Sequence, residues 1–82
     1  MHVVIAKVNE NLYDGEAASV TLPGAEGEMT VLPEHEPLMT TLKAGVITVR
    51  TGDPLTGSVQ EIKFEIEGGV LEVRQDGATV IL

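Results

Sequence analysis

Apolar and polar residues alternate along much of this chain, as in strands with one buried and one solvated face. The clearest example is residues 60–67, where apolar positions alternate with Glu and Lys without a break. Residues 70–74 repeat the pattern. Asp76-Gly77 follows, and Asp-Gly between two apolar runs is typical of a hairpin with a return strand, here at 78–82. The side chains expected inside the first two strands are Ile62, Phe64, Ile66, Leu71 and Val73.

The first half of the chain also predicts short strands, separated by Gly and Pro. Strands are expected at 3–8, 17–22, 27–32 and 45–51, with Ala18, Val20 and Leu22 on one face of the second. Tyr13-Asp14-Gly15 and Pro23-Gly24 are the expected turns, and residues 52–58 form a polar loop. The only arguable helix is 36–43, and Pro37 there precedes a short, Thr-rich run.

Seven or more short strands between Gly and Pro turns indicate an all-β fold, an antiparallel β-sandwich or flattened barrel. The 82 residues allow one domain, 1–82. Only two residues are aromatic, so aliphatic side chains must fill the core. With no cysteine, the chain has no disulfide framework, no thiolate zinc site and no cysteine nucleophile.

The charge of −8 excludes several kinds of partner. The cations are scattered, at Lys7, Lys43, Arg50, Lys63 and Arg74. They form no basic stripe for nucleic acid, and an anionic membrane surface would repel the chain. No apolar run approaches the roughly 20 residues of a membrane span, so we expect no direct membrane insertion. The first residues resemble neither a signal peptide nor a transit peptide, which predicts a cytoplasmic location.

The strongest candidate for chemistry is Glu34-His35-Glu36, because carboxylate and imidazole groups bind divalent metals. Pro33 and Pro37 flank the triplet and favour an extended backbone. In an extended chain the two carboxylates point away from the imidazole, so we expect no metal here. The alternatives are a surface histidine in a polar loop and a histidine that contacts a partner.

The remaining candidates have simpler structural interpretations. His2 is a strand-end residue, and Glu26 and Glu28 are an acidic pair in a solvated turn without the aromatic residues of a sugar cleft. Ser19 and Ser58 lie in no nucleophile motif. Gly68-Gly69 lacks the pattern of a phosphate loop and predicts a tight turn or bulge with positive φ. We therefore expect no catalysis and no cofactor, and favour an interaction domain.

One segment carries a more specific pattern, GEMTVLPEHEPLMTTLKAG at residues 27–45. It resembles the E-G-E…P-x-H-x-P-L-x-T-x-L-x-x-G signature of the F-type ATP synthase epsilon subunit, called delta in mitochondria. The resemblance continues upstream at 12–17 and 20–27, and downstream at 67–73, which is similar to the family's G-G-x-L-E-V segment. It therefore covers nearly the whole chain in the same order and spacing.

The resemblance implies a β-sandwich of about ten strands in the central stalk of the rotor. Such a subunit does no chemistry; it binds the gamma subunit and the c-ring and couples proton or sodium flow to ATP synthesis. It lies at the cytoplasmic face of the bacterial inner membrane. By family matching, the gamma contact would comprise His35, Thr40, Lys7 and Glu67, and the c-ring contact Glu28, Glu26 and Glu34.

The sequence departs from the family pattern in three ways. Thr30 and Glu34 stand where the family often has Gly, and a position with positive φ tolerates Glu poorly. The chain also stops at Leu82, without the family's C-terminal helical hairpin. We expect this polypeptide to lack the inhibitory and ATP-sensing functions of that hairpin.

Two other functions are compatible with these residues. One is a stand-alone β-sandwich module that binds peptides by adding a strand at a sheet edge. The other is a small metal-dependent hydrolase built on Glu28, His35 and Glu36. A melting temperature that rises with divalent metal would favour the hydrolase.

Overall fold

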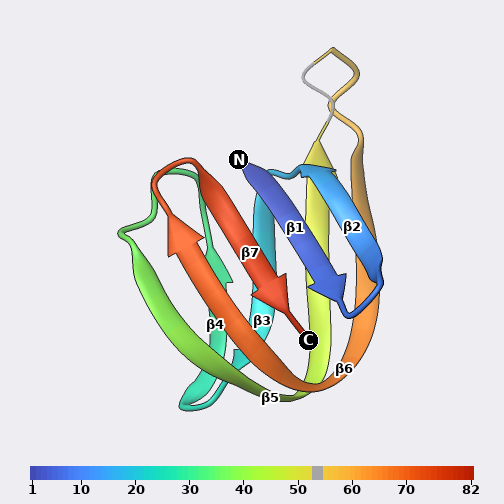
Figure 1. The fold of residues 1–82 in the computed structure, drawn as a ribbon. Helices are drawn as coiled ribbons and strands as arrows, with labels where there is room; N and C mark the ends of the chain where they lie inside the picture. The colour runs from blue at the N-terminus through green and yellow to red at the C-terminus, as the bar shows by residue number, and fades with distance from the viewer. Residues whose placement is uncertain (53–54) are drawn as a thin grey trace.

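The computed structural model describes residues 1–52 and 55–82, and all of its regular elements are β-strands (Figure 1). The strands are β1 (His2–Lys7), β2 (Glu10–Glu16), β3 (Ser19–Gly24), β4 (Gly27–Val31), β5 (Leu38–Gly52), β6 (Val59–Arg74) and β7 (Gly77–Ile81). The all-β class is therefore confirmed, and the weak helix candidate at 36–43 lies mostly in β5. Asp53 and Pro54 of the expected polar loop lie outside the described residues; Leu55 and Thr56 form a turn.

The seven strands form one mixed sheet in the order β2-β1-β7-β6-β5-β3-β4. All neighbours are antiparallel except β1 and β7, which run in parallel (Figure 1). The prediction of a purely antiparallel sheet was therefore wrong at this one pair. The expected count of about ten strands is not observed either. One reason is that β5 and β6 are continuous strands of 15 and 16 residues, which run where several short strands were predicted.

The long β5–β6 hairpin folds the sheet over on itself (Figure 1). Along the edge of β5, Thr21 pairs with Thr48 and Gly24 with Leu42. Two residues of β3 (22–23) therefore stand against five of β5 (43–47), and such an excess bends a strand. On the other edge of β5, Gly68 and Gly69 have φ angles of 154° and 159°. Positive φ was predicted correctly here, but β6 continues through both glycines without a turn.

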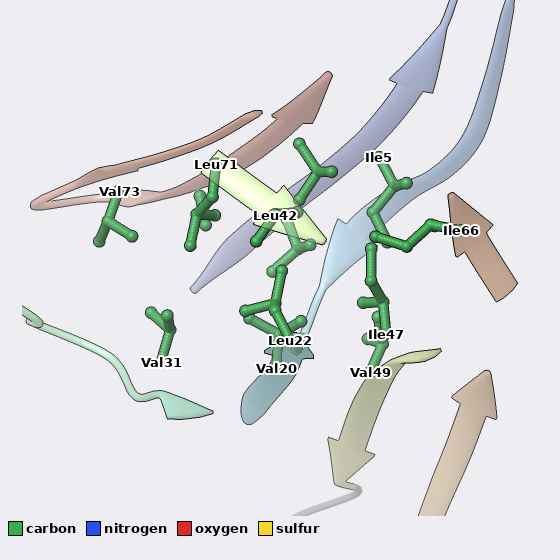
Figure 2. Close-up of a cluster of buried hydrophobic side chains, with 14 residues drawn as sticks. Ile5, Val20, Leu22, Val31, Leu42, Ile47, Val49, Ile66, Leu71 and Val73 are labelled. Carbon is green, nitrogen blue, oxygen red and sulfur yellow. The ribbon is translucent and has the colours of Figure 1, made fainter. Parts of the chain in front are cut away.

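The folded sheet encloses a core of aliphatic side chains (Figure 2). Every strand except β2 contributes, with Val3, Ile5, Val20, Leu22, Val31, Leu42, Ile47, Val49, Ile66, Leu71, Val73, Ala78 and Val80, joined by Ala17. The predicted inward faces are confirmed for β6, where Ile62 and Phe64 are half-buried against this core. The expected face of β3 was wrong at one position, since Ala18 is exposed and precedes the strand, whereas Ala17 is buried.

The predicted turn at Tyr13-Asp14-Gly15 is instead the middle of β2, which pairs with β1 along its whole length. The chain reverses earlier, at Val8 and Asn9, where Asn9 has a φ of 73°. The Tyr13 ring lies beside Gly15 in this strand, 3.5–3.8 Å from where a Cβ would be. The tyrosine hydroxyl then donates a hydrogen bond to the Glu16 carbonyl at 2.8 Å.

The folded sheet has two seams: one joins strands that are not neighbours in the sheet order, and the other joins the β3–β4 hairpin to β5, the sheet neighbour of β3. At one seam β2 lies against β6, with the rings of Tyr13 and Phe64 packed edge to face at 6.3 Å. At the other, the β3–β4 hairpin meets β5, and the Ala25 amide donates to the Thr41 carbonyl at 3.0 Å. Thr41 and β4 at the second seam belong to the segment of the family-like signature, residues 27–45, whereas Ala25 and β3 precede it.

Candidate binding surface

The residues predicted to bind partners are spread over several strands and two loops (Figure 1). Four of them lie in strands, with Lys7 on β1, Glu28 on β4, Thr40 on β5 and Glu67 on β6. Glu34 and His35 lie in the 32–37 loop, at the upper end in Figure 1. Glu26 is in the turn between β3 and β4, at the lower end. The structure thus separates Glu26 from Glu34, although both were assigned to the same partner.

The 32–35 segment is a tight turn in which Glu34 has a φ of 67°. The His35 amide donates to the Leu32 carbonyl at 3.2 Å, which closes a four-residue β-turn. Pro33 takes the second position, where its ring fixes a negative φ, so the turn is of type II. The expectation of an extended triplet was therefore wrong, because it considered only the prolines. Glu34 retains the positive φ that the family's glycine favours.

His35 is half-buried, and its Nδ1 lies 2.8 Å from the Glu36 carbonyl oxygen. Since a carbonyl only accepts, Nδ1 carries the proton in this contact. Nε2 then has a free lone pair or, in the protonated ring, a second donor. Neither carboxylate of the triplet forms an ion pair with the ring within the described ranges, 1–52 and 55–82.

A groove of about 300 Å³ lies at the seam between the β3–β4 hairpin and the start of β5. Its lining includes two exposed acidic residues, Glu26 and Glu28, and two half-buried apolar residues, Met29 and Leu38. Thr40 lines the same groove, so one predicted gamma residue lies with two predicted c-ring residues. The sequence did not indicate that Met29 and Leu38 line the same groove as the acidic residues, because β4 and β5 come together only in the folded sheet.

Lys7 and Glu67 lie away from the groove. Lys7 ends β1, and its Nζ is 3.3 Å from Glu10 Oε1 across the β1–β2 turn. Glu67 is exposed on β6, between Ile66 and Gly68, at the bend of the long hairpin. Both side chains are accessible, with Lys7 already engaged by a neighbouring carboxylate.

Thr30, the other departure from the family's glycines, belongs to a polar row across four strands. Its Oγ1 lies 3.1 Å from Thr21 Oγ1, which accepts a hydrogen bond from Arg50 Nη1 at 2.8 Å. Arg50 Nε donates to Glu61 Oε2 at 2.9 Å. The row runs from β4 through β3 and β5 to β6, and therefore fixes the hairpin that borders the groove.

His2, the first residue of β1, lies beside two carboxylates of β2. Its Nε2 is 2.7 Å from Asp14 Oδ1, and its Nδ1 is 3.6 Å from Glu16 Oε1, both on β2. No group of three or more His, Asp or Glu side chains in the described part of the chain is arranged to hold a metal ion. The same residues contain no helix that is long and apolar enough to span a bilayer.

Comparison with protein families gives one match over the whole chain. The model described as "ATP synthase, Delta/Epsilon chain, beta-sandwich domain" matches residues 1–82. An ATP synthase epsilon chain from Laribacter hongkongensis is 36% identical over 81 residues, which are 99% of this chain and 55% of the relative. The "ATP synthase epsilon chain 2" of Burkholderia orbicola is 41% identical over 81 residues, which are 51% of its length. The chain thus spans about half the length of these relatives.

Solved structures agree with the sequence relatives. A chain in the Euglena gracilis mitochondrial ATP synthase superimposes with a TM-score of 0.82 at 25% identity, covering 96% of this chain and 48% of that chain. A chain in the central stalk and c-ring structure of the Tetrahymena thermophila enzyme gives 0.75 at 14% identity, which establishes a shared fold. It covers 98% of this chain and 60% of the other. By sequence and by fold, the chain therefore belongs to the family of ATP synthase delta/epsilon chains, whose β-sandwich domain it matches.

Proposed function

We propose that this chain is a non-catalytic central-stalk subunit of a proton- or sodium-translocating F-type ATP synthase. In this role residues 1–82 act as one β-sandwich domain that binds the gamma subunit and the c-ring, and so couples ion flow to ATP synthesis. The observation that carries the proposal is the family match, which extends over every residue of the chain. The long hairpin and the packed aliphatic core give the stiff body that transmission of torque requires.

The negative charge of the molecule favours partners of positive charge. The chain has 13 acidic side chains against 5 basic ones, and Glu26, Glu28 and Glu34 are all exposed. We assign these three to the c-ring, and His35, Thr40, Lys7 and Glu67 to gamma. The complex would hold the chain as a peripheral component at the cytoplasmic face of the bacterial inner membrane.

Binding to purified gamma subunit and c-ring tests the proposal. The chain is expected to be retained by both in a pull-down. Retention by neither would contradict the stalk assignment and favour the alternative, a stand-alone β-sandwich module that binds other proteins.

The assignment of His35 to the gamma contact predicts a specific loss of affinity. His35→Ala removes a half-buried side chain that adopts one orientation through its Nδ1 hydrogen bond, so its loss should weaken gamma binding about tenfold. Isothermal titration with gamma measures this. Glu65→Ala, at an exposed β6 position, is the matched control and should leave the affinity within about twofold. Equal losses of gamma affinity in the two variants would show that His35 is not part of the gamma interface.

A further inference from the structure

Asp76 and Gly77 form an Asp-Gly pair at the short turn that joins β6 to β7 (Figure 1). Arg74 pairs with Gly77 across this hairpin, so the loop between them has only two residues, Gln75 and Asp76. The Asp76 side chain is 89% exposed to solvent. Exposed loop tips of this kind open more readily than the strands beside them.

The fold requires glycine at position 77. A Cβ built there would overlap the His2 carbonyl oxygen, because β1 lies directly against β7 at this point. The residue that follows Asp76 therefore has no side chain to shield its backbone nitrogen. Glycine also has the widest backbone freedom, so an Asp-Gly pair lets this nitrogen reach the aspartate carboxyl carbon more easily than any other Asp-Xaa pair.

Few polar contacts hold Asp76 in place. Within residues 1–52 and 55–82 it has two outside the β6–β7 ladder. The His2 amide donates to the Asp76 carbonyl at 3.4 Å, and Arg74 Nε lies 3.6 Å from Asp76 Oδ1. Both distances are longer than those of well-formed hydrogen bonds, so the turn can open locally while the sheet stays folded.

The second Asp-Gly pair of the chain, Asp14-Gly15, lies in a different setting. It is in the middle of β2, where Asp14 pairs with Val4 and Gly15 with Val3. His2 Nε2 is 2.7 Å from Asp14 Oδ1. Any rearrangement at this pair requires the β1–β2 ladder to open and the histidine contact to break. The same dipeptide thus occurs once in an exposed turn and once in a paired strand.

We propose that Asp76 is a site of isoaspartate formation. The Gly77 backbone nitrogen attacks Asp76 Cγ, so that a C–N bond forms and a C–O bond of the carboxyl group breaks. The amide proton and the carboxyl hydroxyl leave together as water. A second water then opens the five-membered succinimide. Cleavage between nitrogen and the α-carbonyl carbon leaves the chain running through Cγ with a free α-carboxylate, whereas cleavage between nitrogen and Cγ restores aspartate.

The isoaspartate lengthens the backbone of the turn by one methylene carbon. Arg74 and Gly77 are then offset in the hairpin, and the carbonyl that accepts the His2 amide becomes part of a carboxylate. A free α-carboxylate of this kind is the group that isoaspartyl methyltransferases methylate with S-adenosylmethionine. The rearranged chain is therefore a substrate for that class of repair enzyme, whether or not the proposed stalk function holds.

Storage of the 82-residue chain for several weeks at neutral pH and physiological temperature tests the proposal. Mass spectrometry with electron-transfer fragmentation locates isoaspartate, and labelled methyl transfer by an isoaspartyl methyltransferase measures its amount. Isoaspartate is expected at Asp76, with at least about tenfold less at Asp14, because the reaction there requires the β1–β2 ladder to open. Equal amounts at the two positions, or isoaspartate at Asp14 alone, would overturn the proposal.

Asp76→Glu is the matched variant. It keeps the charge, but attack on the longer side chain would form a six-membered ring, which closes far more slowly. Before storage the two chains should melt alike, because the side chain is exposed. After storage the isoaspartate form of the native chain should melt about 4–8 °C lower, whereas the variant should be unchanged. An equal fall in the variant would overturn the proposal. The comparison of Asp76 with Asp14 is made in the native chain and does not require the variant to fold.

Discussion

Glu34 holds a backbone conformation that glycine adopts at lower cost. Its φ of 67° costs a residue with a Cβ about 1 kcal/mol, and its exposed side chain forms no ion pair within the described residues. Glu34→Gly should therefore raise the free energy of unfolding by about 0.5–1 kcal/mol, or the melting temperature by roughly 2–8 °C. Thermal unfolding followed by circular dichroism measures the change.

Glu34→Ala separates the backbone from the charge. Alanine removes the carboxylate but retains a Cβ at the positive φ, so stability should change by less than about 0.5 kcal/mol. If alanine stabilised the protein as much as glycine, the gain would come from the lost charge, and the account of turn strain would be wrong.

The sequence predicted some backbone conformations of single residues and not others. Pro33 and Pro37 correctly marked an irregular segment, but they did not reveal that Glu34 occupies the third position of a type II turn. Ordinary propensities do not place Glu there, and only the comparison with the family's glycine pointed to the position. At Gly68-Gly69 the sequence did predict positive φ, because glycine adopts such backbone conformations far more readily than residues with a Cβ.

Gly69 lies where two strand backbones come unusually close. A Cβ built there would lie 2.7 Å from the Ile81 carbonyl oxygen, and φ is 159°. Gly69→Ala must therefore move β7 away from β6 and should destabilise the fold by about 1–3 kcal/mol. Chemical denaturation gives the value. Gly52→Ala is the control: no atom lies within 4 Å of that Cβ, so the change should be near zero or slightly stabilising.

The alternation of buried and exposed residues along β5 predicts losses of different size at two adjacent positions. Ile47 is fully buried, whereas Val46 is 45% exposed. Ile47→Ala should cost about 2–5 kcal/mol in unfolding free energy, because it leaves a cavity in the only extended core cluster of the described residues. Val46→Ala should cost less than about 1 kcal/mol. Similar losses would mean that the face assignment of β5 is wrong.

At the scale of elements, the period-two pattern located most strands and their inward faces, because alternation directly reports one-sided burial. It failed for β2, whose residues are mostly exposed or half-buried and whose Asp-Gly pair resembles a turn. The alternation also did not predict that β5 and β6 are continuous strands. The set of buried positions changes where a strand crosses a bend, so the pattern is interrupted there. The groove could not be predicted, because Leu38 and Thr40 reach Glu28 only through the folding of the sheet.

The whole molecule carries a net charge of −8, which opposes its compact state. Only 5 cations offset 13 acidic groups. Salt screens this repulsion, so the melting temperature should rise by a few degrees between about 20 and 300 mM NaCl, over which the Debye length falls severalfold. Differential scanning calorimetry at constant pH checks this.

The shape of the salt dependence identifies the cause. Screening acts mainly below about 0.3 M, whereas exclusion of salt from apolar surface continues to grow above it. A melting temperature that falls with salt, or rises only above that range, would show that self-repulsion is not important. Binding to a basic partner should respond in the opposite direction and weaken with added salt.

The parallel pairing of β1 with β7 also bears on how the protein is made. Val3 pairs with Ala78, which is 75 positions later (78 minus 3), so β1 is hydrogen-bonded to a strand that is synthesised much later. At ribosomal rates of about 5–20 residues per second, that separation corresponds to roughly 4–15 s of synthesis. During this interval β1 can pair only with β2, and its second edge stays open to other nascent chains. The sheet therefore closes only after β7 has been synthesised, and this fold is not acquired stepwise along the growing chain.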